Sequence, residues 1–150
     1  MGLPTVHYQA YIATQGNIPP GPWANGPDTV GFPGSVLGVE GIRTDIHLNG
    51  ANLGMRLRGR LSTVGDLTWV HTGWFGKPGE GHHIELIAME LTGPDSSVYD
   101  IFYTAYFSAG GFTAPAKNGT QIGAIGNRME AISIWILPKM KSTELPDIKA

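Results

Sequence analysis

Three glutamates recur at a constant interval in this chain, and their carboxylates are its first candidate functional groups. Glu40, Glu85 and Glu130 lie 45 residues apart, and each opens a stretch in which every second residue is mostly apolar. Two interpretations are open, because a buried carboxylate needs hydrogen-bond partners. Each carboxylate accepts backbone N–H groups from a neighbouring Gly-rich turn, or each projects at a rim and accepts sugar hydroxyl groups.

Large aromatic residues lie in or beside the Gly- and Pro-rich turn segments, close to small polar side chains. Such rings either plug the ends of a small barrel or offer a face on which a sugar stacks. The polar neighbours could read vicinal hydroxyl groups, although an Asn before Gly is also a turn signal. The aromatic candidates are Trp23, Trp69, Trp74 and Phe112, and the polar ones are Asn25, Thr72 and Asn118.

The charged residues beside the glutamates indicate an ion pair more than a metal centre. Arg128 precedes Glu130 by two residues and shares its strand face, which predicts an ion pair. His82, His83 and Glu85 supply two types of metal ligand without a third nearby, which is typical of a solvated edge. Motifs of serine hydrolases, zinc proteases and phosphate loops are absent from the sequence. We therefore expect neither catalysis nor a cofactor.

The elements that position these groups are strands arranged in three repeated units. Residues 128–137 alternate with Glu130, Ile132, Ile134 and Ile136 on one face, which is the expected core stripe. Diluted copies of this frame begin at Glu40 and Glu85, and each follows another alternating strand and Gly-rich turns. The units span about residues 5–48, 53–93 and 99–138, and residues 139–150 form a tail expected to be an extended strap or a frayed end.

This organisation predicts an all-β protein of one domain with internal pseudo-threefold symmetry. The 150 residues include 22 Gly and 11 Pro, which favour turns over long helices. One unit cannot bury its apolar face alone, so three copies are expected to close around an axis. A β-prism is favoured because each unit has two long alternating strands, and a β-trefoil is the alternative.

Charge and composition narrow the classes of partner. A formal net charge of −2 gives no electrostatic reason to bind nucleic acid or an anionic membrane. No apolar stretch approaches the roughly 20 residues of a membrane helix, so membrane insertion is not expected. The first residues do not resemble a secretory signal. The absence of Cys is compatible with a protein inside or outside the cell. A homo-oligomer stays open.

The third unit resembles the clostridial hydrophobic-W repeat, a module of bacterial surface and secreted proteins. It reads Tyr-x-Ala-Tyr-Phe-x-x-x-Gly-Phe, then Asn-Gly, Gly-x-x-Gly and Arg-Met-Glu-Ala-Ile-x-Ile. The first and second units keep the Trp and Gly landmarks and the Glu-x-Ile frame. The Gly-Trp pair of that family is Gly111-Phe112 here. The resemblance implies surface attachment or carbohydrate recognition, and action at a cell surface or outside the cell.

The leading functional hypothesis is a lectin-like module with up to three related sites for cell-surface glycans. Weak sites repeated on one rigid body gain avidity against a multivalent surface, which suits binding better than catalysis. The units are not expected to be equal, and those carrying Trp23 and Trp69 are expected to bind better than the one carrying Phe112. The alternative is a structural or adhesion module that binds a protein partner through exposed aromatics.

Overall fold

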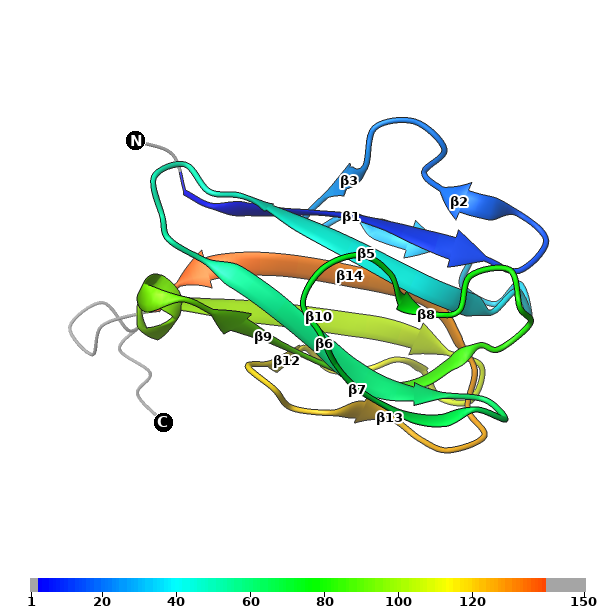
Figure 1. The fold of residues 1–150 in the computed structure, drawn as a ribbon. Coiled ribbons are helices and arrows are strands. Elements are labelled where there is room, and N and C mark those ends of the chain that lie inside the picture. The colour runs from blue at the N-terminus through cyan, green and yellow to red at the C-terminus, as the bar shows by residue number, and fades with distance from the viewer. Residues whose placement is uncertain (1–2, 140–150) are drawn as a thin grey trace, which may run out of the picture.

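The computed structural model describes residues 3–139 of the 150-residue chain and shows an all-β protein (Figure 1). Within this range the only helix is one short 3₁₀ turn, η1 (Pro94–Ser97). No helix among these residues is long and apolar enough to cross a membrane. Of the expected C-terminal tail, only Lys139 belongs to the described residues, and residues 140–150 lie outside them.

In the described part of the chain, six long strands form three antiparallel pairs, and each pair is the centre of one sheet (Figure 1). Alternating apolar and β-branched residues favour these strands. The pairs are β1 (Thr5–Ile12) with β5 (Val39–His47), β6 (Gly54–Leu61) with β9 (Ile84–Thr92), and β10 (Tyr99–Phe107) with β14 (Met129–Pro138).

Within residues 3–139, eight shorter strands complete the sheets, and none of these sheets closes into a barrel. They are β2 (Gly16–Ile18), β3 (Ala24–Asn25), β4 (Thr29–Gly31), β7 (Gly65–Val70), β8 (Phe75–Gly76), β11 (Gly111–Phe112), β12 (Ala116–Lys117) and β13 (Ile122–Gly123). Strands β2 and β3 pair with β1, β7 with β6, and β11 and β12 with β10. The remaining three cross to another sheet: β4 pairs with β14, β8 with β5, and β13 with β9.

A glycine at the end of each crossing strand makes this pairing sterically possible. Gly76 has φ +106°, and a Cβ there would lie 2.4 Å from the carbonyl oxygen of Glu40. Gly31 and Gly123 also have positive φ and approach the backbone of the other two sheets equally closely. Only glycine combines this conformation with so close an approach.

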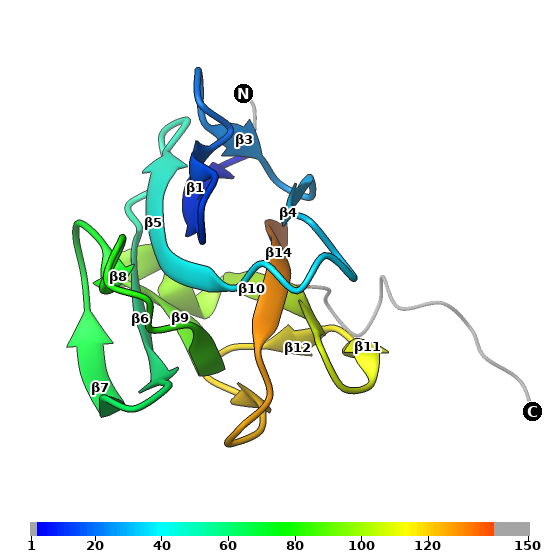
Figure 2. The same ribbon diagram turned by 90° about the vertical axis from the view of Figure 1, so that its right-hand side faces the viewer.

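The three sheets lie around one shared hydrophobic core, as the end-on view shows (Figure 2). Strand β1 packs beside β14, β9 beside β10, and β5 beside β6. Ile42, Ile87 and Ile132, which occupy the same place in the three long strands, have no exposed surface. Full burial of each of these side chains contributes roughly 1.5–3 kcal/mol to the free energy of folding, so this stripe is a main source of stability.

Strand β14 is buried on both of its faces over most of its length. Ile132 and Ile134 lie in the core as the alternation predicts, but Ala131 is also fully buried. Residues 26–31 cover the edge of β14: β4 pairs with it in the sheet, Gly26 lies against the backbone of Ile134, and Ser133 donates a hydrogen bond to the carbonyl oxygen of Pro27 at 2.5 Å. Near-continuous burial of a strand thus arises from a segment about 100 residues away.

Each repeated glutamate is the extra residue of a β-bulge, which the regular alternation did not predict. Gly41 pairs with Tyr11 and Val39 with Ile12, so Glu40 has no partner on β1. The ladders of the other two sheets skip Glu85 and Glu130 in the same way. A bulge re-aims the side chain it carries, and here it turns each carboxylate towards a neighbouring loop.

Candidate functional site

The three glutamate carboxylates bind backbone N–H groups of the Gly-rich loops that follow the crossing strands. Oε1 of Glu40 accepts hydrogen bonds from the N–H of Gly79 at 2.9 Å and of Gly81 at 3.2 Å. Glu130 and Glu85 accept corresponding bonds: the N–H of Gly34 donates to Oε1 of Glu130 at 2.8 Å, and the N–H of Gly126 donates to Oε2 of Glu85 at 3.0 Å. The exposed fractions of the three residues are 1–6%. These contacts are the ones that the structural interpretation of the carboxylates predicts.

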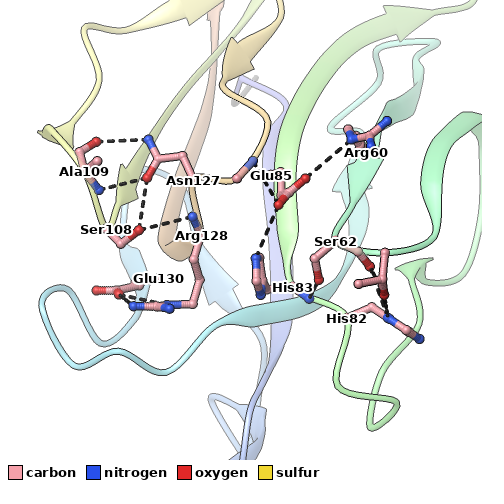
Figure 3. Close-up of polar contacts among 12 residues, drawn as sticks. Arg60, Ser62, His82, His83, Glu85, Ser108, Ala109, Asn127, Arg128 and Glu130 are labelled. Atoms are coloured by element: carbon pink, nitrogen blue, oxygen red, sulfur yellow. Dashed lines mark hydrogen bonds and ion pairs between the residues drawn. The ribbon is translucent and has the colours of Figure 1, made fainter.

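The charged neighbours of Glu130 and Glu85 differ, as Figure 3 shows. Oε2 of Glu130 accepts hydrogen bonds from Nε of Arg128 at 3.1 Å and from Nη2 at 3.0 Å, which confirms the predicted ion pair. Glu85 has longer contacts, at 3.4 Å from Oε1 to Nε of Arg60 and at 3.5 Å from Oε2 to Nε2 of His83. The carboxylate of Glu130 is therefore the more strongly paired of the two.

The histidines beside Glu85 have structural partners. Burial lowers the pKa of the His83 imidazole below its ordinary value, Glu85 opposes this shift, and Arg128 adds to it. Nδ1 of His82 lies 2.8 Å from Oγ1 of Thr63. Within residues 3–139, no three His, Cys, Asp or Glu side chains come together as a group that could hold a metal ion.

Two of the predicted aromatic residues share one arginine on the outer face of the β1–β5 sheet. The guanidinium of Arg43 lies 4.8 Å from the ring centroid of Trp23 and 4.6 Å from that of Trp74. Oε1 of Gln9 accepts hydrogen bonds from Nε and Nη2 of Arg43 at 2.9 and 2.7 Å. Gln9 is buried and in turn donates to the carbonyl oxygen of Pro19. Cation–π contacts of this kind fix the orientation of both rings.

Trp69 lies on the outer face of the β6–β9 sheet with two arginines. Arg56 is 4.1 Å and Arg58 is 5.0 Å from its ring centroid. Arg56 also forms an ion pair with Glu90 from β9. The rings of three tryptophans are therefore contacted by guanidinium groups of arginines on the long strands. Trp23 and Trp74 come from segments between strands, whereas Trp69, predicted in or beside a turn, lies in strand β7.

The third unit presents its aromatic residue differently. Phe112 is 52% exposed, and its ring meets that of Tyr106 edge to face at 5.1 Å between centroids. Asn118 is committed to its turn: it accepts a hydrogen bond from the N–H of Ile101 and donates one to Asp100 at 2.7 Å. Its φ of +49° also fits the turn interpretation.

The structure brings several of the predicted residues together around Trp23. A hollow of about 370 Å³ is bordered by Trp23, Thr72, His71 and Asp45, between strand β5 and the segment that joins β7 to β8. A second hollow of about 530 Å³ is bordered by Trp23 and Asn25, together with the polar residues Asp28 and Thr29. Trp23 thus forms part of the wall of both hollows. Glu40, Glu85, Glu130, Trp69, Trp74, Phe112, Asn118 and Arg128 border neither of these two hollows.

The sequence did not single out the arginines that contact the tryptophans. Arg43 stands on the face of its strand opposite to the core stripe, where polar residues normally meet solvent. Arg43 lies 20 residues from Trp23 and 31 residues from Trp74 in the sequence, and such a separation carries no signal that the side chains will meet. Trp135, which stacks on Phe102 at 5.7 Å between centroids, was missed as an outer aromatic pair for the same reason.

Comparison of the chain with models of known protein families, with curated proteins and with solved structures found no match.

Proposed function

We propose that this protein is a lectin-like module that binds glycans, with its main site at Trp23. The observation that carries this proposal is the position of Trp23 in the walls of two hollows. Thr72, which belongs to a different predicted unit, borders one of them, and Asn25 borders the other. An aromatic ring next to hydroxyl and amide groups is the combination that sugar recognition needs.

The free energy of such a site comes mainly from its aromatic ring. An exchanged hydrogen bond contributes only about 0.5–1.5 kcal/mol net, because the sugar gives up bonds to water. Apolar area buried against the indole adds roughly 25 cal/mol per Å². Arg43 and Gln9 hold the Trp23 ring in place from one side, so little ordering of the ring is needed on binding.

We further propose that the three units form a β-prism with a pseudo-threefold axis. The cyclic crossing of β4, β8 and β13 to another sheet supports this arrangement. The contacts of Glu40, Glu85 and Glu130 with the loops that follow those strands support it as well. Repetition of the unit would place up to three related sites on one body, which suits a multivalent glycan surface.

The three sites are proposed to differ in strength. Trp23 borders two hollows, whereas the Trp69 ring is contacted by both Arg56 and Arg58. Phe112 lies exposed on Tyr106 with a smaller ring than Trp. We therefore rank the Trp23 site first and the Phe112 site last.

A glycan array tests the proposal, followed by inhibition of cell agglutination with the simple sugar that the array identifies. We expect selective binding that Trp23→Ala weakens and that Phe112→Ala leaves nearly unchanged. Phe112 is the matched control because it is an aromatic residue on the surface of another unit. An array without any selective signal, or equal loss in both variants, would contradict the proposal.

The second candidate is an adhesion module with a protein partner, favoured by the exposed ring of Phe112, which packs against the half-buried Tyr106. This function predicts adhesion to cells that persists after enzymatic removal of glycans and that Phe112→Ala abolishes. The same two variants therefore distinguish the candidates, because each function predicts sensitivity of a different aromatic residue.

A further inference from the structure

Three arginines stand in a row on the outer face of strand β6. Arg56, Arg58 and Arg60 alternate with buried residues of the same strand, so neighbouring arginines are about 7 Å apart along it. The whole chain has a formal net charge of −2. A row of cations on one strand attracts anionic groups, even though the net charge of the protein is negative.

The carboxylates near this row neutralise it incompletely. Glu90 pairs with Arg56, but Arg60 has only the long contacts with Glu85 at 3.4 Å and with Asp66 at 3.5 Å. Nε of Arg60 is buried and has no hydrogen-bond acceptor among the described residues. Arg58 forms no ion pair with any residue in the range 3–139.

The two incompletely paired arginines border the same hollow. It has a volume of about 320 Å³, and its polar lining consists of Arg58, Arg60, Asp66 and Gln121. Leu67 and Leu86 supply an apolar part of the wall. Ligand pockets are commonly about 300–1,000 Å³, so this hollow suits a small charged group or a single sugar ring. Gln121 comes from the segment that leads into β13, so the crossing strand completes the wall.

The ring of Trp69 orients the guanidinium of Arg58. The indole contacts the guanidinium of Arg58 at 5.0 Å while Arg56 occupies a nearer position at 4.1 Å. A guanidinium that stacks on a ring keeps its N–H groups in the plane of its edge, where they can bind two oxygens of one ligand at once. Lysine has no such fork, so an arginine at this position is specific for planar or tetrahedral oxyanions.

We propose that this hollow is a binding site for an oxyanion, the sulfate, phosphate or carboxylate group of a ligand. Arg58 supplies the principal contact, Arg60 adds charge, and Gln121 donates from its amide. Asp66 opposes the anion, and because its side chain is 83% exposed it can turn towards solvent. The site does not include Trp23, so it stands independently of the glycan proposal.

The test is an NMR titration of the whole protein with sodium sulfate, with sodium chloride at equal ionic strength as reference. The Nε–H signals of the arginines and the amide signals around β6 report on the site. We expect saturable shifts with sulfate that chloride does not reproduce. Arg58→Gln should weaken sulfate binding at least about tenfold, because hydrogen bonds to charged groups are strong. Asp66→Asn should tighten it.

Arg43→Gln is the matched control, because Arg43 also lies on tryptophan rings but outside this hollow. Its sulfate affinity should equal that of the unmodified protein. Linear shifts without saturation, equal shifts with chloride, or equal weakening in Arg43→Gln and Arg58→Gln would each overturn the proposal. The opposite change in Asp66→Asn is a separate check should Arg58→Gln fold poorly.

A second titration identifies the carrier of the anion by comparing dextran sulfate with neutral dextran. Tighter binding of dextran sulfate than of free sulfate, with the same dependence on Arg58, would assign the site to sulfated or otherwise acidic saccharides. Binding of free sulfate without competition by dextran sulfate would support a site for small oxyanions. Binding of neutral dextran at Trp23 with no response to either anion would sustain the glycan proposal and overturn this one.

Discussion

Removal of the Glu130 carboxylate should destabilise the fold because it connects two distant parts of the chain. Glu130 is 1% exposed, and its carboxylate accepts a hydrogen bond from the N–H of Gly34 in the loop after β4. It also accepts two hydrogen bonds from Arg128. In Glu130→Ala both partners lose their acceptor, and neither has a replacement among the described residues.

The size of this effect follows from the burial of the partners. Removing one member of a buried ion pair costs about 3–5 kcal/mol, because the other charge stays buried without compensation. The Arg128 side chain is 28% exposed, so water recovers part of its solvation. The lost bond to the N–H of Gly34 adds to the cost. We expect Glu130→Ala to lower the free energy of unfolding by about 2–4 kcal/mol.

Glu90→Ala is the matched control for this prediction. Glu90 also pairs with an arginine, but both side chains of its pair with Arg56 are 31% exposed. Pairs near the surface contribute about 0–1 kcal/mol, so this variant should be nearly as stable as the unmodified protein. Urea unfolding followed by tryptophan fluorescence gives both values, provided that the slopes agree.

Two results would refute the reasoning on Glu130. A loss below about 0.5 kcal/mol in Glu130→Ala would mean that the loop does not depend on the carboxylate. Equal losses in Glu130→Ala and Glu90→Ala would mean that burial of the pair does not determine its contribution.

Three further predictions concern the core, a strained turn and alkaline stability. Ile132→Ala should cost about 2–5 kcal/mol in urea unfolding because Ile132 is fully buried, and a cost below about 0.5 kcal/mol would place it outside the core. Val36 has φ +62° and is 69% exposed, so Val36→Gly should relieve backbone strain and raise the free energy of unfolding by roughly 0.5–1 kcal/mol; a loss of stability would contradict this. Burial raises the pKa of the Tyr8 hydroxyl to about 12 from 10.0. The folded protein therefore keeps a proton that the unfolded chain releases, and stability should fall as the pH rises from about 10 to about 12. Tyr8→Phe should flatten this alkaline decline, and an unchanged pH profile would contradict the assignment.

The strands and their core stripe could be predicted because periodicity in the sequence reports them directly. Ile132 and Ile134 alternate with less apolar neighbours, and the structure buries both. The contact of Arg128 with Glu130 was predicted from their spacing of two positions, although Arg128 lies just before β14 and Glu130 is its bulge residue. Local order within a strand needs no knowledge of the rest of the chain.

The crossing strands and the bulges could not be predicted, because tertiary packing decides them. Strands β8 and β13 have two residues each, too few for any alternation to show. A bulge at Glu40 leaves the sequence pattern of its strand unchanged and appears only in the pairing with β1. The sequence contains 22 glycines and does not distinguish Gly76, which has a positive φ, from the others.

The contacts of Trp23 and Trp74 could not be predicted from the sequence, because they join segments between strands to Arg43, which is distant in the sequence. Arg43 and Trp74 are 31 residues apart and belong to different predicted units. Turn segments rich in Gly and Pro can approach either face of a sheet, and their composition does not say which. The candidate residues Trp23, Asn25 and Thr72 were identified individually, and only the fold places them around the same hollows.

Titration calorimetry of the unmodified protein and of Trp23→Ala, with the glycan selected on the array, is the most direct test of glycan binding at Trp23. The unmodified protein should show saturable heat, and Trp23→Ala should lose at least about tenfold in affinity or one site in stoichiometry, since the ring supplies most of the apolar burial. Its melting temperature should stay close to that of the unmodified protein, because Trp23 lies outside the buried core. Unchanged affinity and stoichiometry in a folded Trp23→Ala variant would contradict the account.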